Sequence, residues 1–174
     1  MSLSKEDISE DGCECILYGE LFTTYGAVID EVKSRTRKCI TKQTLSTPKD
    51  LLFPSSSTVD SRSLISPSAI TKAGVILGGD MFGIRVDDRF NNQYLSYLVN
   101  MVYKNKLAKY AKGSTIVHLH YGEIKNVEIE LPALEVQDRA VKILTSLENK
   151  IRIETNFMSV YQVQKEYLLQ NLFI

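Results

Sequence analysis

The sequence has little of what marks membrane, secreted or strongly basic proteins. No stretch approaches the run of about 18 apolar residues that a membrane helix needs, and no signal-peptide pattern opens the chain. Its cysteines, Cys13, Cys15 and Cys39, are too few and odd in number for a disulfide scaffold. Lys and Arg number 21, as do Asp and Glu, so the net charge is zero and a globally basic nucleic-acid binder is excluded. We therefore expect a soluble, cytoplasmic protein.

Catalytic motifs are absent as well. The run Lys112-Gly113-Ser114-Thr115 has the wrong order for a phosphate-binding loop, and neither G-x-S-x-G nor H-E-x-x-H occurs. Residues 74–80 are glycine-rich without matching a dinucleotide-binding fingerprint, and they predict a tight turn between strands. We expect a chain that is not an enzyme and that needs no cofactor.

A zinc site is the main alternative to a chain without metal or catalytic chemistry. Cys13 and Cys15, like His118 and His120, are two residues apart, a spacing that places both side chains on one face of a strand. Together they would supply the ligands of a Cys2His2 zinc site, but structural zinc sites favour wider cysteine spacing. Small buried thiols and two polar histidines are the alternative, which we favour, so no metal is predicted. A metal-dependent hydrolase at this cluster is the most remote alternative.

The first part of the chain predicts a compact mixed α/β domain. The chain has 174 residues, of which 44% are hydrophobic, enough for one domain with a core. Short apolar or alternating runs predict strands, and 3–4 spacing of apolar residues from Asn92 to Ala111 predicts an amphipathic helix capped by Asn91 or Asn92. Residues 54–58 predict a polar loop. The predicted strands are 15–18, 51–53, 74–77, 82–86 and 127–131. We expect an α+β fold, with this domain spanning residues 1–132.

Residues 133–174 have a different character and predict one long helix. Residues 135–173 contain neither Gly nor Pro, and a heptad row of apolar residues runs along them. The apolar members of this row, hereafter the seam, are Leu144, Leu147, Ile151, Met158, Tyr161, Leu168 and Leu172, interrupted by Glu154 and Lys165. A helix of this length measures about 57 Å, too long for a domain with a radius of gyration of about 14 Å to cover. We expect coiled-coil pairing with a second copy, the alternative being a helix packed wholly on its own domain.

Charge is distributed in blocks although it sums to zero. Acidic residues dominate residues 5–31, and a basic block follows with Lys33, Arg35, Arg37 and Lys38. The segment 18–25 adds aromatic and hydroxyl side chains just before that basic block. Basic and hydroxyl side chains hold phosphates and read base edges, so these segments predict a polar binding surface. An ordinary solvated surface is the alternative.

Several segments resemble the DNA specificity (S) subunits of type I restriction-modification systems. In chain order they are ILYGELFTTYG (16–26), IDEV (29–32), SRT (34–36), LGGD (77–80), GSTIVHL (113–119), LPALEVQ (131–137) and LLQNLFI (168–174). The resemblance covers one target-recognition domain and its following conserved helix, half of a complete subunit. Family members usually begin with a further short strand and basic turn, so the chain is expected to be shortened at its N-terminus.

The resemblance implies a non-catalytic subunit that binds double-stranded DNA and brings methyltransferase and restriction subunits to a bipartite target. Two copies joined through the helix would rebuild the complete form and predict a palindromic split site. Family domains read bases from loops, which suggests Thr23, Thr24, Tyr25, Ser55, Ser56 and Ser57 as base-proximal residues. Phosphate contacts are expected from Lys33, Arg35, Arg37, Lys38 and Lys112, with Ser114, Thr115 and His118 in either role. A coiled-coil adaptor without a nucleic-acid role is the alternative.

Overall fold

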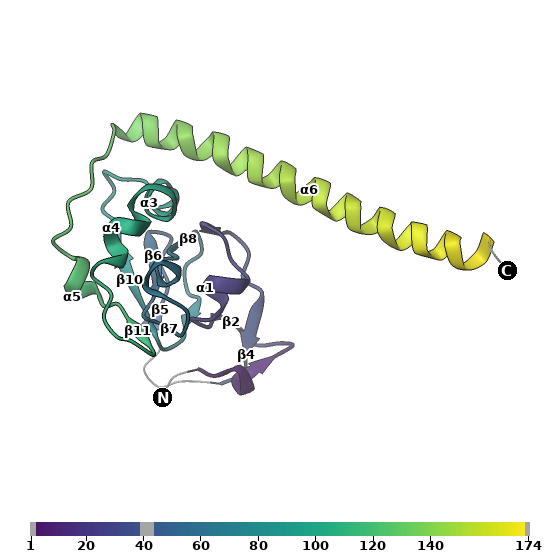
Figure 1. Cartoon of the computed structure of the whole chain (residues 1–174), viewed down its shortest axis with the longest axis horizontal. Coiled ribbons are helices and arrows are strands. Elements are labelled where there is room, and N and C mark those ends of the chain that lie inside the picture. Colours follow the sequence, from purple (N-terminus) through teal and green to yellow (C-terminus); the bar gives the residue numbers. More distant parts are fainter. Residues whose placement is uncertain (1–2, 39–43, 173–174) are drawn as a thin grey trace. The chain divides into compact units, whose positions relative to one another are not determined.

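The chain consists of two compact units, Met1–Leu134 and Glu135–Ile174. The computed structural model describes residues 3–38 and 44–172. The first unit is a mixed α/β domain and the second is one long helix, labelled α6 in Figure 1. This confirms the predicted α+β fold with a long C-terminal helix.

One sheet of the domain gathers the acidic and basic blocks of the sequence. Its five strands run in the order β1-β4-β2-β9-β5. β4 pairs antiparallel with both β1 and β2, while β9 is parallel to β2. Their bounds are β1 Ile8–Ser9, β2 Cys13–Ile16, β4 Ser34–Thr36, β5 Thr44–Leu45 and β9 Ile76–Leu77. A 3-10 turn, Lys5–Asp7, precedes β1. The strand predicted at 15–18 therefore starts and ends two residues earlier.

A second sheet holds the centre of the core. Its order is β10-β6-β8-β3, with β6 at Asp50–Pro54 buried along its whole length. The continuous apolar run of β6 is typical of a strand covered on both faces. Phe53 is paired with Phe82 of β10, and their rings stack with centroids 5.1 Å apart. The other strands are β3 Val28–Ile29, β8 Ser68–Ile70 and β10 Met81–Arg85.

The predicted helix 92–111 is interrupted. It consists of α3 (Asn92–Leu98), a π-helical segment (Val99–Tyr103) and α4 (Lys104–Ala108). Asn91 is the N-cap, and its side chain accepts a hydrogen bond from the backbone N–H of Tyr94 at 3.0 Å. Because a π turn adds a residue, the apolar spacing shifts and Val102 is 66% exposed instead of buried. α3 packs against β6 and β8 (Figure 1).

Two sequence predictions are corrected within the domain. Residues 127–131 form no strand, although Val127 and Ile129 do pack against the core. The segment is held by side chains instead, since Lys106 donates to the carbonyl of Glu128 at 2.8 Å and the Tyr103 hydroxyl accepts from the N–H of Glu130 at 3.1 Å. The predicted polar loop at 54–58 is also wrong.

Most of that predicted loop is strand. Pro54 ends β6, and Ser56–Ser57 form β7, which pairs with β11 (Val117–His118) in a two-stranded ribbon. The domain is completed by the short helices α1 (Glu20–Thr23), α2 (Ser61–Leu64) and α5 (Tyr121–Ile124). The hydroxyl-rich sequence predicted a loop, because Ser and Thr side chains can hydrogen-bond to the backbone in place of a neighbouring strand. Here β11 supplies the backbone hydrogen-bond partners of β7.

The helix α6 spans Leu134–Leu172 without a break. Every seam residue is at least 36% exposed, up to 70% at Leu172. A second exposed apolar row lies on the adjacent helix face, one that the sequence reasoning missed. This second row consists of Ile143, Ile153, Phe157, Val160 and Tyr167. Neither α6 nor any other helix in the described ranges is apolar over a stretch long enough to cross a membrane.

Candidate nucleic-acid interface

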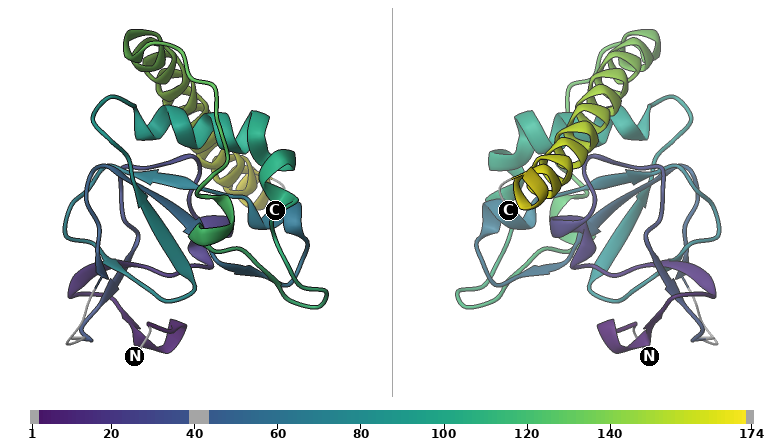
Figure 2. Two further views of the ribbon diagram at one scale, coloured as in Figure 1. Left: turned by 90° about the vertical axis from the view of Figure 1, so that its left-hand side faces the viewer. Right: turned by 90° about the vertical axis from the view of Figure 1, so that its right-hand side faces the viewer.

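A tight hairpin carries four of the predicted site residues. Lys112 and His118 face each other across it, with their backbones joined by hydrogen bonds of 2.9 and 2.7 Å. Gly113 has a φ of +123°, and a Cβ there would lie 2.0 Å from the carbonyl oxygen of Ile116. Only glycine fits this turn. The turn leaves Ser114 and Thr115 exposed at its tip. Figure 2 shows this hairpin as a green loop that projects from the domain.

The ribbon brings a second group of predicted residues to the same place. Ser56 pairs with His118 and Ser57 with Val117, so the antiparallel register places the turn after β7 beside the tip of the hairpin. Ser55 anchors the ribbon, because its N–H donates to the carbonyl of Asp80 at 2.7 Å and its own carbonyl accepts from the N–H of Leu119 at 2.9 Å. Ser55 itself is buried. We call this surface, made of Ser56, Ser57, Lys112, Ser114, Thr115 and His118, the ribbon surface.

Apolar groups stand among the hydroxyls of the ribbon surface. Val59, in the turn after β7, is 74% exposed, and Ile116, at the hairpin tip, is 47% exposed. Hydroxyls and an imidazole can donate to or accept from base edges, and an apolar side chain can contact the methyl group of thymine. The ribbon surface therefore holds the kinds of group that read a DNA groove.

Lys112 is the cation of this surface. Its ammonium lies 3.3 Å from the carboxylate of Glu123, and its side chain is 78% exposed. The pKa of Glu123 is lowered, first by the backbone N–H of His120 and then by Lys112. An ion pair this exposed contributes little to stability, so Lys112 can exchange its carboxylate partner for a phosphate at small cost.

Thr23, Thr24 and Tyr25 lie elsewhere, at the end of α1. The Thr23 hydroxyl donates to the carbonyl of Gly19 at 3.1 Å, and the Tyr25 hydroxyl accepts from the backbone N–H of Lys33 at 3.0 Å. Burial raises the pKa of Tyr25. Within the described ranges, no hydrogen bond or ion pair joins these residues to the ribbon surface. The fold thus uses the Tyr25 hydroxyl to fix the chain that enters β4.

The basic block is paired with the acidic block. Lys33 lies 2.5 Å from Glu31, Arg35 lies 3.9 Å from Glu14, and Lys38 lies 2.8 Å from Asp7. Arg37 forms two hydrogen bonds with the Asp11 carboxylate, which lower the pKa of Asp11. The reason is topological, because β4 lies between β1 and β2, and Asp7, Asp11 and Glu14 lie in or next to those two strands. All four cations predicted to hold phosphates in this block therefore have an acidic partner nearby.

The cysteines and histidines considered as zinc ligands lie in different sheets. Cys13 and Cys15 are on β2, with Cys15 buried, whereas His118 is on β11 and stacks with His120 at a centroid distance of 6.3 Å. Burial raises the pKa of the Cys15 thiol to about 11. Cys39 lies outside the described residues. In the part of the chain that the structure describes, no three His, Cys, Asp or Glu side chains converge as metal ligands do.

One cation beside the ribbon was missed by the sequence reasoning. Arg62 is exposed on α2, and α2 packs against both β7 and β11. α2 also contacts α4, which carries Lys104 and Lys106, so basic segments far apart in the sequence lie side by side here. A four-residue helix gives no periodic signal, and its neighbours are set only by the fold.

Comparison with known proteins assigns this architecture to a class of DNA-recognition domain. Residues 18–158 match the family model described as the type I restriction modification DNA specificity domain. The match covers most of the chain, so the chain belongs to this family. No curated protein sequence matches it.

Solved structures of the same systems share the fold. A chain from a study of complex assembly and conformational transition of the type I R-M system is 20% identical, with a TM-score of 0.58 over 88% of this chain and 35% of that one. The HsdS subunit from Thermoanaerobacter tengcongensis is 18% identical, with a TM-score of 0.55 over 88% and 34%. The type I S subunit from M. genitalium is 16% identical, with a TM-score of 0.50 over 86% and 35%. The chain thus spans about a third of the length of these relatives, and at such identities the likeness shows the fold.

Proposed function

We propose that this chain is the sequence-specific DNA-recognition subunit of a type I restriction-modification system. The observation that carries the proposal is the family match, which runs through the α/β domain and into α6. The chain acts without catalysis of its own and brings methyltransferase and restriction subunits to the target. The ribbon surface supports this role, since it gathers hydroxyls, an imidazole and a cation on one exposed edge.

The chain acts as half of a complete recognition unit. It carries one domain and one long helix, and it covers 35% of a related chain of the same fold. The exposed seam supports pairing, because an apolar row along a solvent-exposed helix is stabilised when a second helix covers it. Two identical copies related by a two-fold axis present two identical domains, so the DNA target is bipartite and palindromic.

The residues divide by role. Ser56, Ser57, Ser114, Thr115 and His118 approach the base edges, with Lys112 on a neighbouring phosphate. Thr23 and Thr24, at the end of α1, form a separate base-proximal group, whereas Ser55 and Tyr25 position the segments around them. The paired cations of the basic block, Lys33, Arg35, Arg37 and Lys38, reach phosphates only by leaving their carboxylates.

The second row supports a further partner. If the seam pairs with another copy, Ile153, Phe157, Val160 and Tyr167 remain as apolar surface on the adjacent face. Exposed apolar patches of this kind mark protein contacts. We assign this face to the methyltransferase subunit.

The test is co-expression of the chain with its methyltransferase subunit, followed by sequencing of methylated bases in the host genome. A palindromic motif with an unread spacer is the expected result. A split motif with two different halves would contradict pairing of identical copies. The absence of any motif, with the complex assembled, would contradict DNA recognition and favour the adaptor alternative.

A further inference from the structure

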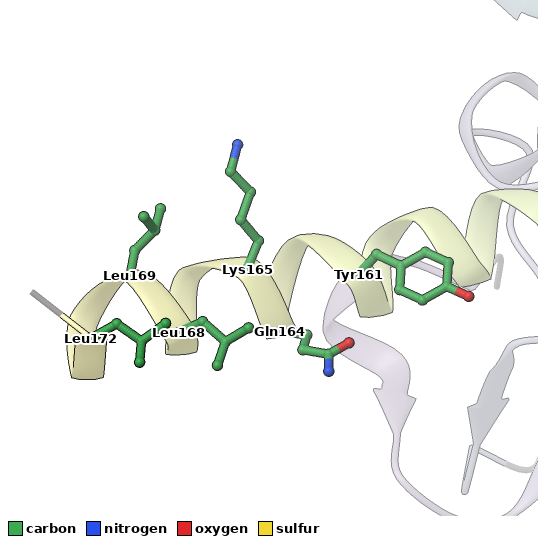
Figure 3. A pocket seen from close by; sticks show the side chains of 6 residues that line it. All are labelled: Tyr161, Gln164, Lys165, Leu168, Leu169 and Leu172. Atoms are coloured by element: carbon green, nitrogen blue, oxygen red, sulfur yellow. The ribbon is translucent and has the colours of Figure 1, made fainter.

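The seam of α6 is interrupted by two opposite charges. Glu154 and Lys165 occupy seam positions of different heptad type, d and a, and both are exposed. Neither forms an ion pair with another residue of the ranges that the structure describes. Figure 3 shows Lys165 projecting from the same end of α6 as Tyr161, Leu168 and Leu172. A lone charge inside an apolar contact is costly unless an opposite charge meets it.

Charge selects the orientation of two paired copies. In a parallel pair, like positions face each other, so Glu154 would meet Glu154 of the second copy and Lys165 would meet its Lys165. Both contacts are repulsive and would lie between apolar neighbours. In an antiparallel pair, a positions face d positions, so Glu154 and Lys165 can meet. Only the antiparallel orientation neutralises both charges.

Charge also selects the register, given the two-copy assembly proposed above. We propose that α6 pairs antiparallel with a second copy so that Glu154 of each copy faces Lys165 of the other. The seam residues from Leu147 to Leu172 then all face an apolar partner, and only Leu144 lies beyond the paired segment. Ile151 faces Leu168, Met158 faces Tyr161, and Leu147 faces Leu172 of the second copy.

In the two neighbouring registers, Glu154 and Lys165 no longer face an opposite charge. A shift by one heptad in one direction places Glu154 against Met158 and Lys165 against Leu147. The opposite shift places Glu154 against Leu172 and Lys165 against Tyr161. Either shift leaves charges buried against apolar side chains, the kind of mismatch by which polar seam residues specify register.

This register fixes the centre of the assembly. The two-fold axis passes between Ser159 and Val160, and each charge pair occurs twice. The matched segment, residues 147–172, is about 39 Å long at about 1.5 Å per residue. The proposal therefore names the partner, its direction and the contacts along its length.

The test is a charge-swap series on the intact chain, measured by sedimentation equilibrium without DNA or methyltransferase. Glu154→Lys creates two Lys–Lys contacts and Lys165→Glu creates two Glu–Glu contacts, so each should raise the dimer dissociation constant at least about 30-fold. The double variant Glu154→Lys/Lys165→Glu reverses each pair and should return to within about threefold of the wild type. Glu166→Lys makes the same charge change on the opposite helix face and should leave the constant unchanged.

Each contrary result overturns the proposal. Single variants that dimerise like the wild type would indicate a parallel pair or another register. A double variant that stays as weak as the single ones would show that the two residues do not meet. A wild-type chain that remains monomeric would exclude identical copies. None of these results concerns DNA, so the recognition role would stand or fall separately on the methylation motif.

Discussion

Replacing Ile151 by Glu should dissociate the two-copy assembly while leaving the α/β domain intact. Ile151 is 65% exposed in the single chain. Fully burying an Ile side chain stabilises by about 1.5–3 kcal/mol, so covering the exposed part contributes about 1–2 kcal/mol in each copy. The two-fold axis doubles this to about 2–4 kcal/mol, which corresponds to a dissociation constant about 30-fold to 1,000-fold higher. The unpaired carboxylate facing Leu168 adds to the loss.

Sedimentation equilibrium over a wide concentration range measures this constant. Asn156→Glu is the matched control, because it introduces the same side chain on the polar face of α6 and should leave the mass unchanged. Thermal unfolding of the domain should be the same in both variants, since Ile151 belongs to no core cluster. If Ile151→Glu dimerised as tightly as Asn156→Glu, the seam could not be the contact, and the reasoning from the heptad row would be refuted.

Three further predictions concern the domain. In the assembled complex, Lys112→Ala should weaken binding to all DNA sequences alike and reduce the slope of log K against log salt by about 0.9, the value for one phosphate. Arg37→Ala should change that slope less, because Arg37 is paired with Asp11. Equal changes in the two variants would show that the ion pairs of the basic block open on DNA. Gly113→Ala should strain the hairpin by about 1–3 kcal/mol and lower DNA affinity without changing the dimer mass, and unchanged affinity would separate the hairpin from recognition. The pKa of Asp7 is lowered to about 2 by the ammonium of Lys38 and by Ser4, whereas an unfolded Asp titrates near about 3.9. Because the folded value is the lower one, the stabilisation is present above about pH 4 and is lost as the pH falls through about 2, and Asp7→Asn should remove that part of the acid dependence of the unfolding temperature.

The long helix and the buried strands could be predicted because local pattern decides them. The absence of Gly and Pro over residues 135–173 permits one helix, and α6 is continuous there. Leu51, Leu52 and Phe53 form a short apolar run of the kind typical of a covered strand, and they lie in β6. In both cases the element is decided by residues that are neighbours in the sequence, without a contribution from distant segments.

Features that depend on distant partners could not be predicted in this way. Ser56 and Ser57 look like loop residues until β11, sixty positions later in the chain, supplies their backbone partners. Val127 and Ile129 alternate with polar residues as a strand does, but no strand in the described ranges pairs with them. The π turn that exposes Val102 leaves no periodic signature in the sequence.

The pairing of the charge blocks bears directly on how such a chain would use DNA. Sequence spacing indicated a basic face at Lys33 to Lys38, but each of these cations has an acidic partner nearby, and the field of that face is largely cancelled. Non-specific DNA binding depends on uncompensated cations, so a neutral domain of this kind should hold random DNA weakly. In the proposed role, its discrimination would rest on the ribbon surface, and the affinity that positions it on DNA would come from partner subunits. The distribution of charge in this fold therefore favours the proposed role over that of a stand-alone, non-specific DNA binder.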